Sequence, residues 1–138
     1  MSSVYTSSVV INCSPADVVA FMSVPENQML WSSFVRSTRP LGNGRHEMDT
    51  MFGNRVAYRI DRHDETGIVD IVLETPVGES VMPTRATPHS RGSFFSFGII
   101  RPPAISDEDW QRSCAGLDGE LATLKQVIER RIADQAAA

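Results

Sequence analysis

The sequence of 138 residues lacks the features that mark several large classes of protein. It contains only two cysteines, Cys13 and Cys114, which form no pair with metal-ligand spacing, so free thiols are expected. No run of about 18 apolar residues is present, which argues against a membrane-spanning helix. The first ten residues lack the basic start and apolar core of a signal peptide. We therefore expect a cytoplasmic protein with no integral membrane association.

Lysine is almost absent, since Lys125 is the only one, and the arginines are scattered along the chain. A nucleic-acid-binding protein usually concentrates its basic residues in a stripe, so no nucleic-acid partner is expected. What is present is typical of a globular domain: 41% of the residues are hydrophobic, 22% are charged, and the net charge is −4. A chain of this length forms one core, so we predict a single domain over residues 1–138.

The N-terminal part predicts a strand followed by two short helices. Residues 4–11 are rich in β-branched and aromatic side chains, which favour a strand. Ser14 followed by Pro15 and Asp17 is typical of a helix start, because the hydroxyl caps free amides and the carboxylate suits the helix dipole. Pro25 begins a second short helix, which we predict to end near residue 32.

From residue 34 to residue 100 the pattern alternates between strands and turns. Asn43-Gly44 is a strong hairpin signal. Short strands at this spacing, joined by tight turns, predict an antiparallel meander with six or seven strands in all. After the first strand, the predicted strands are residues 34–41, 45–52, 55–62, 68–75, 80–87 and 93–100.

The chain ends in a long amphipathic helix. Ser106 caps it, and acidic residues fill its first turn, where negative charge is stabilised. Apolar side chains then follow at steps of four and three residues, which is the spacing of one helix face. These side chains are Trp110, Cys114, Leu117, Leu121, Leu124 and Ile128.

Three segments resemble a known family. Residues 9–21, Val-Val-Ile-Asn-Cys-Ser-Pro-Ala-Asp-Val-Val-Ala-Phe, resemble the opening of the START-like, polyketide cyclase/dehydrase superfamily, also called SRPBCC or Bet v 1-like. Pro25-Glu26-Asn27 followed by Trp31 is similar to the stretch that comes next in that group. Residues 116–125, Gly-Leu-Asp-Gly-Glu-Leu-Ala-Thr-Leu-Lys, are similar to its closing segment.

The resemblance implies a helix-grip fold of the α+β class. In that fold a curved antiparallel sheet, here of six or seven strands, wraps around a long C-terminal helix, and two short helices follow the first strand. A cavity lies between the sheet and the long helix. Members bind lipids, sterols, polyketides or plant hormones, some catalyse cyclisation or dehydration, and some are co-chaperones. The fold alone does not choose among these functions.

Our leading hypothesis is that this chain binds a small hydrophobic molecule in the cavity without catalysis. A lipid, a polyketide or another aromatic or isoprenoid-like molecule would fit. One alternative is an enzyme of the polyketide cyclase or dehydratase type, with an acid–base group in the cavity. A second alternative is a co-chaperone or stress-response interaction module with a filled interior. An enzyme requires polar groups that converge on one point, whereas a carrier requires only isolated ones.

Strand alternation predicts which side chains face the cavity, since neighbouring residues of a strand point to opposite faces. The predicted ligand-binding residues are Trp31, His46, Met48, Tyr58, Ile60, Ile71, Leu73, Met82, Thr84, Phe95, Phe97, Trp110 and Leu117. Ordinary core packing is the alternative for the apolar members. The alternative for His46 is a surface position after the hairpin turn, and for Tyr58 it is a buried hydroxyl bonded to the protein.

The sequence contains no recognisable catalytic or metal-binding motif. His46, His63 and His89 lie on different predicted elements without ligand spacing, so neither a metal nor another cofactor is expected. His46 and Tyr58 are the only candidates for a general acid–base group. Exposed sheet edges need covering, which makes a homodimer a further hypothesis.

Overall fold

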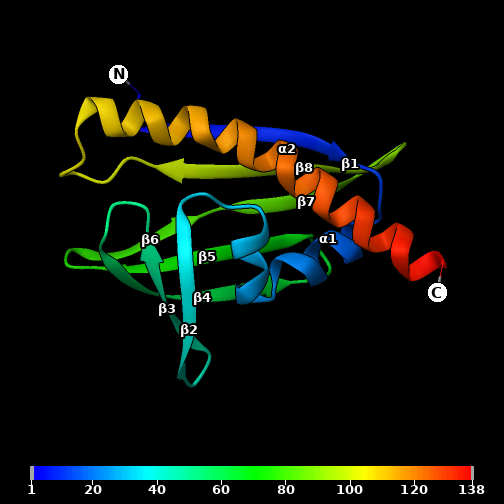
Figure 1. The fold of residues 1–138 in the computed structure, drawn as a ribbon, viewed down its shortest axis with the longest axis horizontal. Coiled ribbons are helices and arrows are strands. Elements are labelled where there is room, and N and C mark those ends of the chain that lie inside the picture. Colours follow the sequence, from blue (N-terminus) through cyan, green and yellow to red (C-terminus); the bar gives the residue numbers. More distant parts are fainter. Residues whose placement is uncertain (1, 138) are drawn as a thin grey trace.

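The computed structural model describes residues 2–137, in which eight strands form one antiparallel sheet with a long helix lying along it (Figure 1). The predicted single domain of residues 1–138 extends one residue beyond this range at each end. The strands are β1 (Val4–Ile11), β2 (Val35–Gly42), β3 (Arg45–Thr50), β4 (Arg55–His63), β5 (Ile68–Thr75), β6 (Gly78–Met82), β7 (Thr84–His89) and β8 (Gly92–Ile100). The helices are α1 (Pro15–Met22), the 3₁₀ helix η1 (Pro25–Leu30) and α2 (Asp107–Ala137).

The strand order places the first and second strands at opposite edges of the sheet. The order is β1-β8-β7-β5-β4-β3-β2, and β6 pairs with β5 off this path. α1 packs against β7, and η1 packs against β2, so the two short helices cover one end of the curved sheet (Figure 1). This arrangement confirms the predicted α+β helix-grip architecture.

The structure has eight strands where six or seven were predicted, because the segment 80–87 forms two strands. Pro83 lies between them and has no amide hydrogen to donate to a sheet. The chain changes partners at this residue. β6 pairs with β5 as far as Met82, which lies opposite Ile71. β7 pairs with β8 from Thr84, which lies opposite Phe97.

The hydrogen bonds of Ser14 and Ser106 confirm the two predicted helix caps. The Ser14 hydroxyl accepts a hydrogen bond from the Asp17 amide at 3.2 Å, and the Ser106 hydroxyl accepts one from the Asp109 amide at 3.1 Å. The second short helix is of the 3₁₀ type and ends at Leu30. Across residues 2–137, no helix combines the length and the apolar character that crossing a membrane requires.

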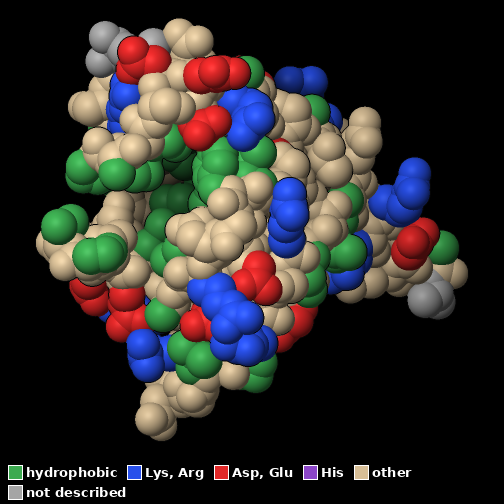
Figure 2. Space-filling model, turned by 60° about the vertical axis from the view of Figure 1, so that its left-hand side comes forward, with side chains coloured by type: hydrophobic (Ala, Val, Ile, Leu, Met, Phe, Trp, Pro, Cys, Tyr) green, Lys and Arg blue, Asp and Glu red, His purple; other side chains and the backbone are tan. Residues whose placement is uncertain are grey.

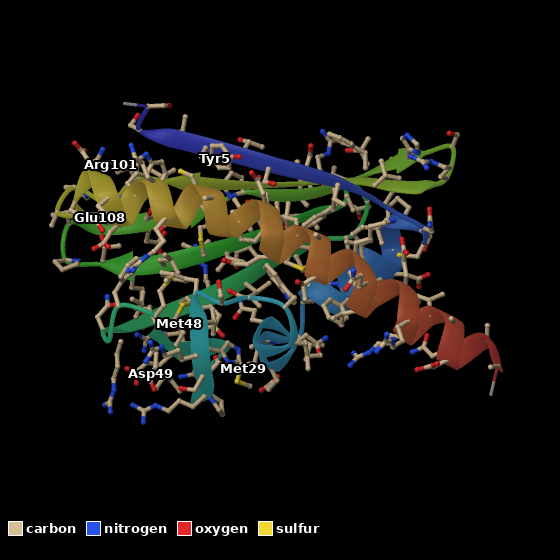
Figure 3. The ribbon with its side chains drawn as sticks, turned by 45° about the horizontal axis from the view of Figure 1, so that its top comes forward. Tyr5, Met29, Met48, Asp49, Arg101 and Glu108 are labelled. Atoms are coloured by element: carbon tan, nitrogen blue, oxygen red, sulfur yellow. The ribbon has the colours of Figure 1, made fainter. Side chains whose placement is uncertain are left out.

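A single carboxylate fastens the first half of α2 to β1. Asp118 accepts hydrogen bonds from the Tyr5 hydroxyl at 2.8 and 2.9 Å and from the Ser7 hydroxyl at 2.6 Å. Figure 3 shows Tyr5 on β1, beside α2. The hydrogen bond to Asp118 is the main cause that raises the pKa of Tyr5 above its ordinary value.

The second half of α2 is held to the same strand by two further contacts. The Lys125 ammonium donates to the backbone oxygen of Val10 at 2.8 Å, and the Glu129 carboxylate accepts from the Asn12 amide at 2.8 Å. Lys125 and Glu129 also form an ion pair at 2.6 Å. These contacts fix α2 along the β1 edge, while the sheet curves away towards β2 (Figure 1).

Removing the Asp118 carboxylate is expected to loosen α2 from β1. Two hydroxyl donors would lose a charged acceptor, so Asp118→Ala should lower the free energy of unfolding by about 1–2 kcal/mol. Urea unfolding followed by circular dichroism measures this change. Asp134→Ala is the matched control, because Asp134 is exposed on the same helix. It should change the same free energy by less than about 0.5 kcal/mol. Equal losses in the two variants would contradict the role given to Asp118.

Candidate functional site

Most of the side chains that strand alternation predicted to face the cavity lie in or against the hydrophobic core. Ten of the thirteen predicted ligand-binding residues belong to the hydrophobic core or pack against it. The buried members are Trp31, Met48, Tyr58, Ile71, Phe95, Phe97 and Leu117, and the partly buried members are Ile60, Leu73 and Met82. They come from the residue after η1, from β3, β4, β5, β6 and β8, and from α2, so the curved sheet gathers residues that are far apart in sequence.

Thr84 and Trp110 are buried as well, but the protein itself uses their polar atoms. The Thr84 hydroxyl donates to the backbone oxygen of Val69. The Trp110 indole N–H donates to the backbone oxygen of Ser2 at 2.9 Å. Trp110 therefore ties α2 to the start of the chain. It lines a depression beside Ser2 and lies outside the core cluster that ten of the predicted residues join or pack against.

The inner face is sealed at one end and reached by solvent at the other. The sealed end contains Ile11, Val69, Ala86 and Phe95, each at most 2% exposed. Towards the end where α2 begins, Leu73, Met82 and Ile99 pack against the core but stay partly exposed. Figure 2 brings this end forward and shows a hollow with hydrophobic side chains in its depth and around its rim. A concave apolar surface with few polar groups is typical of a small-molecule site.

α2 is held on its other side by contacts far from β1. The Arg112 guanidinium lies 5.7 Å from the centre of the Phe52 ring, in the turn between β3 and β4. The Glu120 carboxylate accepts a hydrogen bond at 2.9 Å from the Ser33 hydroxyl, just before β2. The helix thus bridges the two edges of the curved sheet over the inner face.

Tyr58 lies at the centre of a polar group inside the apolar interior. Its hydroxyl donates to the Gln28 side-chain oxygen at 3.2 Å and shares a hydrogen bond with the Thr38 hydroxyl. Burial raises the pKa of Tyr58, and the bond to Thr38 opposes this in part. The phenol therefore stays protonated at neutral pH, and its hydroxyl is bonded to the protein, which is the alternative that the sequence left open.

Two buried nitrogen atoms have no hydrogen-bond partner among residues 2–137: Nε1 of Trp31 and Nδ1 of His46. His46 is half-buried beside Tyr58, with the two ring centres 5.6 Å apart. The structure thus places His46 at the inner face and brings the two predicted acid–base candidates together. Trp31 packs edge-on against Phe97, with the ring centres 5.9 Å apart.

Glu120 is a polar group of this region that the sequence interpretation missed. It is half-buried, and burial raises the pKa of its carboxyl group, while hydrogen bonds from Ser33 and Ser32 oppose the rise. Its position, three residues after Leu117 and four before Leu124, places it beside the buried stripe of α2. That spacing was the available signal, but a lone helical glutamate is usually solvated.

The two cysteines are free thiols, as predicted. Burial is the main cause that raises the pKa of Cys13 to about 11, and burial also raises the pKa of Cys114. The thiolate is the reactive form of cysteine, so raised pKa values leave both side chains weak nucleophiles at neutral pH.

Two surface depressions lie apart from the hollow. One, of about 520 Å³, is lined only by α2 residues between Gln126 and Gln135. The other, of about 370 Å³, lies between the start of the chain and the first turns of α2 and includes Tyr5, Trp110 and Cys114. One helix face cannot enclose a ligand, and neither depression is lined by the strands of the meander, so the hollow is the better candidate site.

Comparisons with known proteins identify the fold. No protein-family model matches the sequence, and a search of curated proteins finds no relative. A START superfamily protein from Mycobacterium smegmatis shares 10% identity over 92% of this chain and 97% of that chain, with a TM-score of 0.71. The Aha1 dimer from Colwellia psychrerythraea shares 11% identity over 91% of this chain and 96% of that chain, with a TM-score of 0.70. Ara h 8.0201 shares 15% identity over 91% of this chain and 96% of that chain, with a TM-score of 0.62.

Identities at this level establish a common fold and no more. The chain has the START-like (SRPBCC, Bet v 1-like) helix-grip fold, which confirms the resemblance seen in its sequence. The similar structures carry the names of different proteins, so what this chain does has to be inferred from its own inner face.

The buried position of Glu120 predicts a dependence of stability on pH. Folding raises the pKa of this carboxyl group. At pH values between the unfolded-state and the folded-state pKa, the folded chain therefore holds a proton that the unfolded chain has lost. The free energy of unfolding therefore falls as the pH rises from about 4.3, the ordinary pKa of Glu, through the higher folded-state pKa. Glu120→Gln should flatten this fall and make the variant more stable than the native protein at neutral pH.

Urea unfolding at several pH values from acid to neutral measures this effect. Glu108→Gln is the control, because Glu108 is exposed in the first turn of the same helix (Figure 3). The control should keep the native pH slope. If Glu120→Gln also kept the native slope, the assignment of this pH dependence to Glu120 would be wrong.

Proposed function

We propose that the protein binds a small hydrophobic molecule in the hollow between α2 and the inner face of the sheet. The observation that carries this proposal is the partial exposure of Leu73, Met82 and Ile99 beside the buried core of the apolar inner face. Each Å² of apolar surface that a ligand removes from water stabilises the complex by about 25 cal/mol. A lipid, a polyketide or another aromatic or isoprenoid-like molecule offers the apolar surface that this site would cover.

The resemblance to a family that includes carriers of lipids, sterols and polyketides supports the same function. The START superfamily protein from Mycobacterium smegmatis covers almost the whole of this fold. The proposed ligand-binding residues are those that line or underlie the hollow, foremost Leu73, Met82 and Leu117. Catalysis is not part of the proposal.

One observation favours the enzymatic alternative, which is the position of His46 beside Tyr58. A cyclase or dehydratase would use His46 as a general base, with its Nδ1 free of protein partners. The Tyr58 hydroxyl, however, is bonded to Thr38 and Gln28. The Glu120 carboxylate is likewise bonded to Ser33. Of these three titratable groups only His46 keeps an unpaired buried polar atom among residues 2–137, whereas an enzyme requires polar groups that converge on the substrate. Binding without chemistry is therefore the better supported function.

An interaction module is the remaining alternative, and exposed apolar residues on η1 bear on it. Val24, the residue before η1, and Met29 and Leu30 at its end are 43–47% exposed. Figure 3 shows Met29 at η1, which packs beside β2. Such residues could contact a protein partner. A homodimer through the free edges of β1 or β2 and a cytoplasmic location remain predictions.

Native mass spectrometry of the purified protein tests the proposal directly. A bound small molecule should appear as a mass adduct that disappears on denaturation, and extraction then identifies it. The protein stripped of this molecule should bind 1-anilinonaphthalene-8-sulfonate, a dye that fluoresces in apolar sites. A bare mass together with no dye binding would contradict the proposed function and leave the interaction module as the better explanation.

Filling the hollow is expected to abolish binding without harming the fold. Leu73→Trp adds a large ring to the partly exposed inner face, so the affinity for the dye should fall at least about tenfold. Glu74→Trp is the matched control, because Glu74 is the next residue of β5 and is exposed on the opposite face. The control should bind within about twofold of the native affinity. Equal weakening in both variants would show that the dye binds elsewhere.

A further inference from the structure

The two tryptophans of this chain are in opposite hydrogen-bonding states. The Trp110 indole N–H donates to the backbone oxygen of Ser2 at 2.9 Å. Trp31 is 6% exposed, its Nε1 is out of contact with solvent, and that atom has no partner among residues 2–137. Buried polar groups in proteins are almost always paired, so an unpaired indole N–H at the centre of a core requires an explanation.

An indole nitrogen can only donate a hydrogen bond, which fixes the chemistry of its missing partner. The partner has to be an acceptor. His46 is less informative, because a neutral imidazole nitrogen donates in one tautomer and accepts in the other. Trp31 is thus the residue that requires a hydrogen-bond acceptor on a bound ligand.

Three polar side chains of the interior make their hydrogen bonds within the protein. Gln28, three residues before Trp31, accepts from the Tyr58 hydroxyl with its side-chain oxygen. Thr38 is bonded to the same Tyr58 hydroxyl, and Thr84 donates to a backbone oxygen. None of these bonds involves the Trp31 N–H, which has no acceptor among residues 2–137.

Trp31 also occupies the right depth for contact with a ligand. Its ring packs edge-on against Phe97, which lies in the middle of the sheet opposite Ser7 and Thr84. Trp31 and Phe97 belong to the core cluster against which the partly exposed Leu73 and Met82 pack. The indole therefore belongs to the buried core on which the residues of the hollow pack, and not to the outer surface.

We propose that the Trp31 N–H anchors an acceptor oxygen of the bound molecule. The ligand is then a largely apolar compound with a carbonyl or comparable acceptor at the end that enters the hollow first. A pure hydrocarbon lacks such an acceptor. This inference rests on the proposed function, because it needs the hollow to hold a ligand. A hydrogen bond to a buried donor both orients the ligand and removes the unsatisfied N–H, so the site discriminates against molecules that lack the oxygen.

Benzophenone and diphenylmethane form a matched probe pair, since they differ by a carbonyl group in place of a methylene group. Their affinities are measured by displacement of 1-anilinonaphthalene-8-sulfonate from the native protein. Benzophenone is expected to bind about tenfold more tightly than diphenylmethane, which is the gain in affinity that one buried hydrogen bond provides. In Trp31→Phe the preference should vanish, while in Trp110→Phe it should persist, because Trp110 already uses its N–H within the protein.

The indole N–H resonances provide a second readout that needs no variant. In protein labelled with ¹⁵N at the tryptophan indoles, benzophenone should move the Trp31 resonance downfield, as a new hydrogen bond does, and diphenylmethane should not. The Trp110 resonance serves as the internal reference and should stay in place with both probes.

The outcomes separate the two proposals. If the dye binds in the hollow and both probes displace it equally, with no shift of the Trp31 resonance, the anchoring role is overturned and the proposed function stands. A carbonyl preference that persists in Trp31→Phe also overturns the anchoring role and assigns the contact to another donor. If the dye itself fails to bind, the proposed function fails, and this inference fails with it.

Discussion

The hydrogen bonds from Tyr5 and Ser7 to Asp118 hold α2 against the first strand, and the geometry of the interior depends on that attachment. The helix lies along the β1 edge and meets the region near β2 through individual side chains. Side chains therefore have to fill the space between the helix and the middle strands. Where α1 covers the sheet, its buried side chains such as Phe21 and Met22 complete the packing. Where α2 begins, no second helix is available, and the hollow results.

The polar groups of the interior follow a consistent physical rule, and its exceptions are informative. Burying a polar atom costs free energy unless it is hydrogen-bonded. Tyr58, Gln28 and Thr84 obey the rule through bonds to protein groups. Nε1 of Trp31 and Nδ1 of His46 do not obey it among residues 2–137. A carrier whose interior is otherwise satisfied can use such an exception to recognise one polar feature of an apolar ligand.

Much of the candidate site could be predicted because strand alternation is a local property. Once Tyr58 is placed facing inward, Val56 and Ile60 follow, and the register with β5 adds Leu73 opposite Tyr58. The polar contacts could not be predicted in this way. Glu120 meets Ser33 across 87 positions of sequence, and only the path of α2 over the curved sheet brings the two together. The division at Pro83 was visible as a proline, but its consequence depends on which neighbours the two strands choose.

The sequence by itself determined the elements and their faces: the caps at Ser14 and Ser106, the alternating strands and the amphipathic stripe of α2. These depend on interactions between residues close in the chain, which spacing reveals. The tertiary structure alone decided that solvent reaches the inner face at one end and that Trp31 keeps an unpaired N–H. Both properties depend on contacts between elements that are far apart in the sequence, which no local pattern encodes.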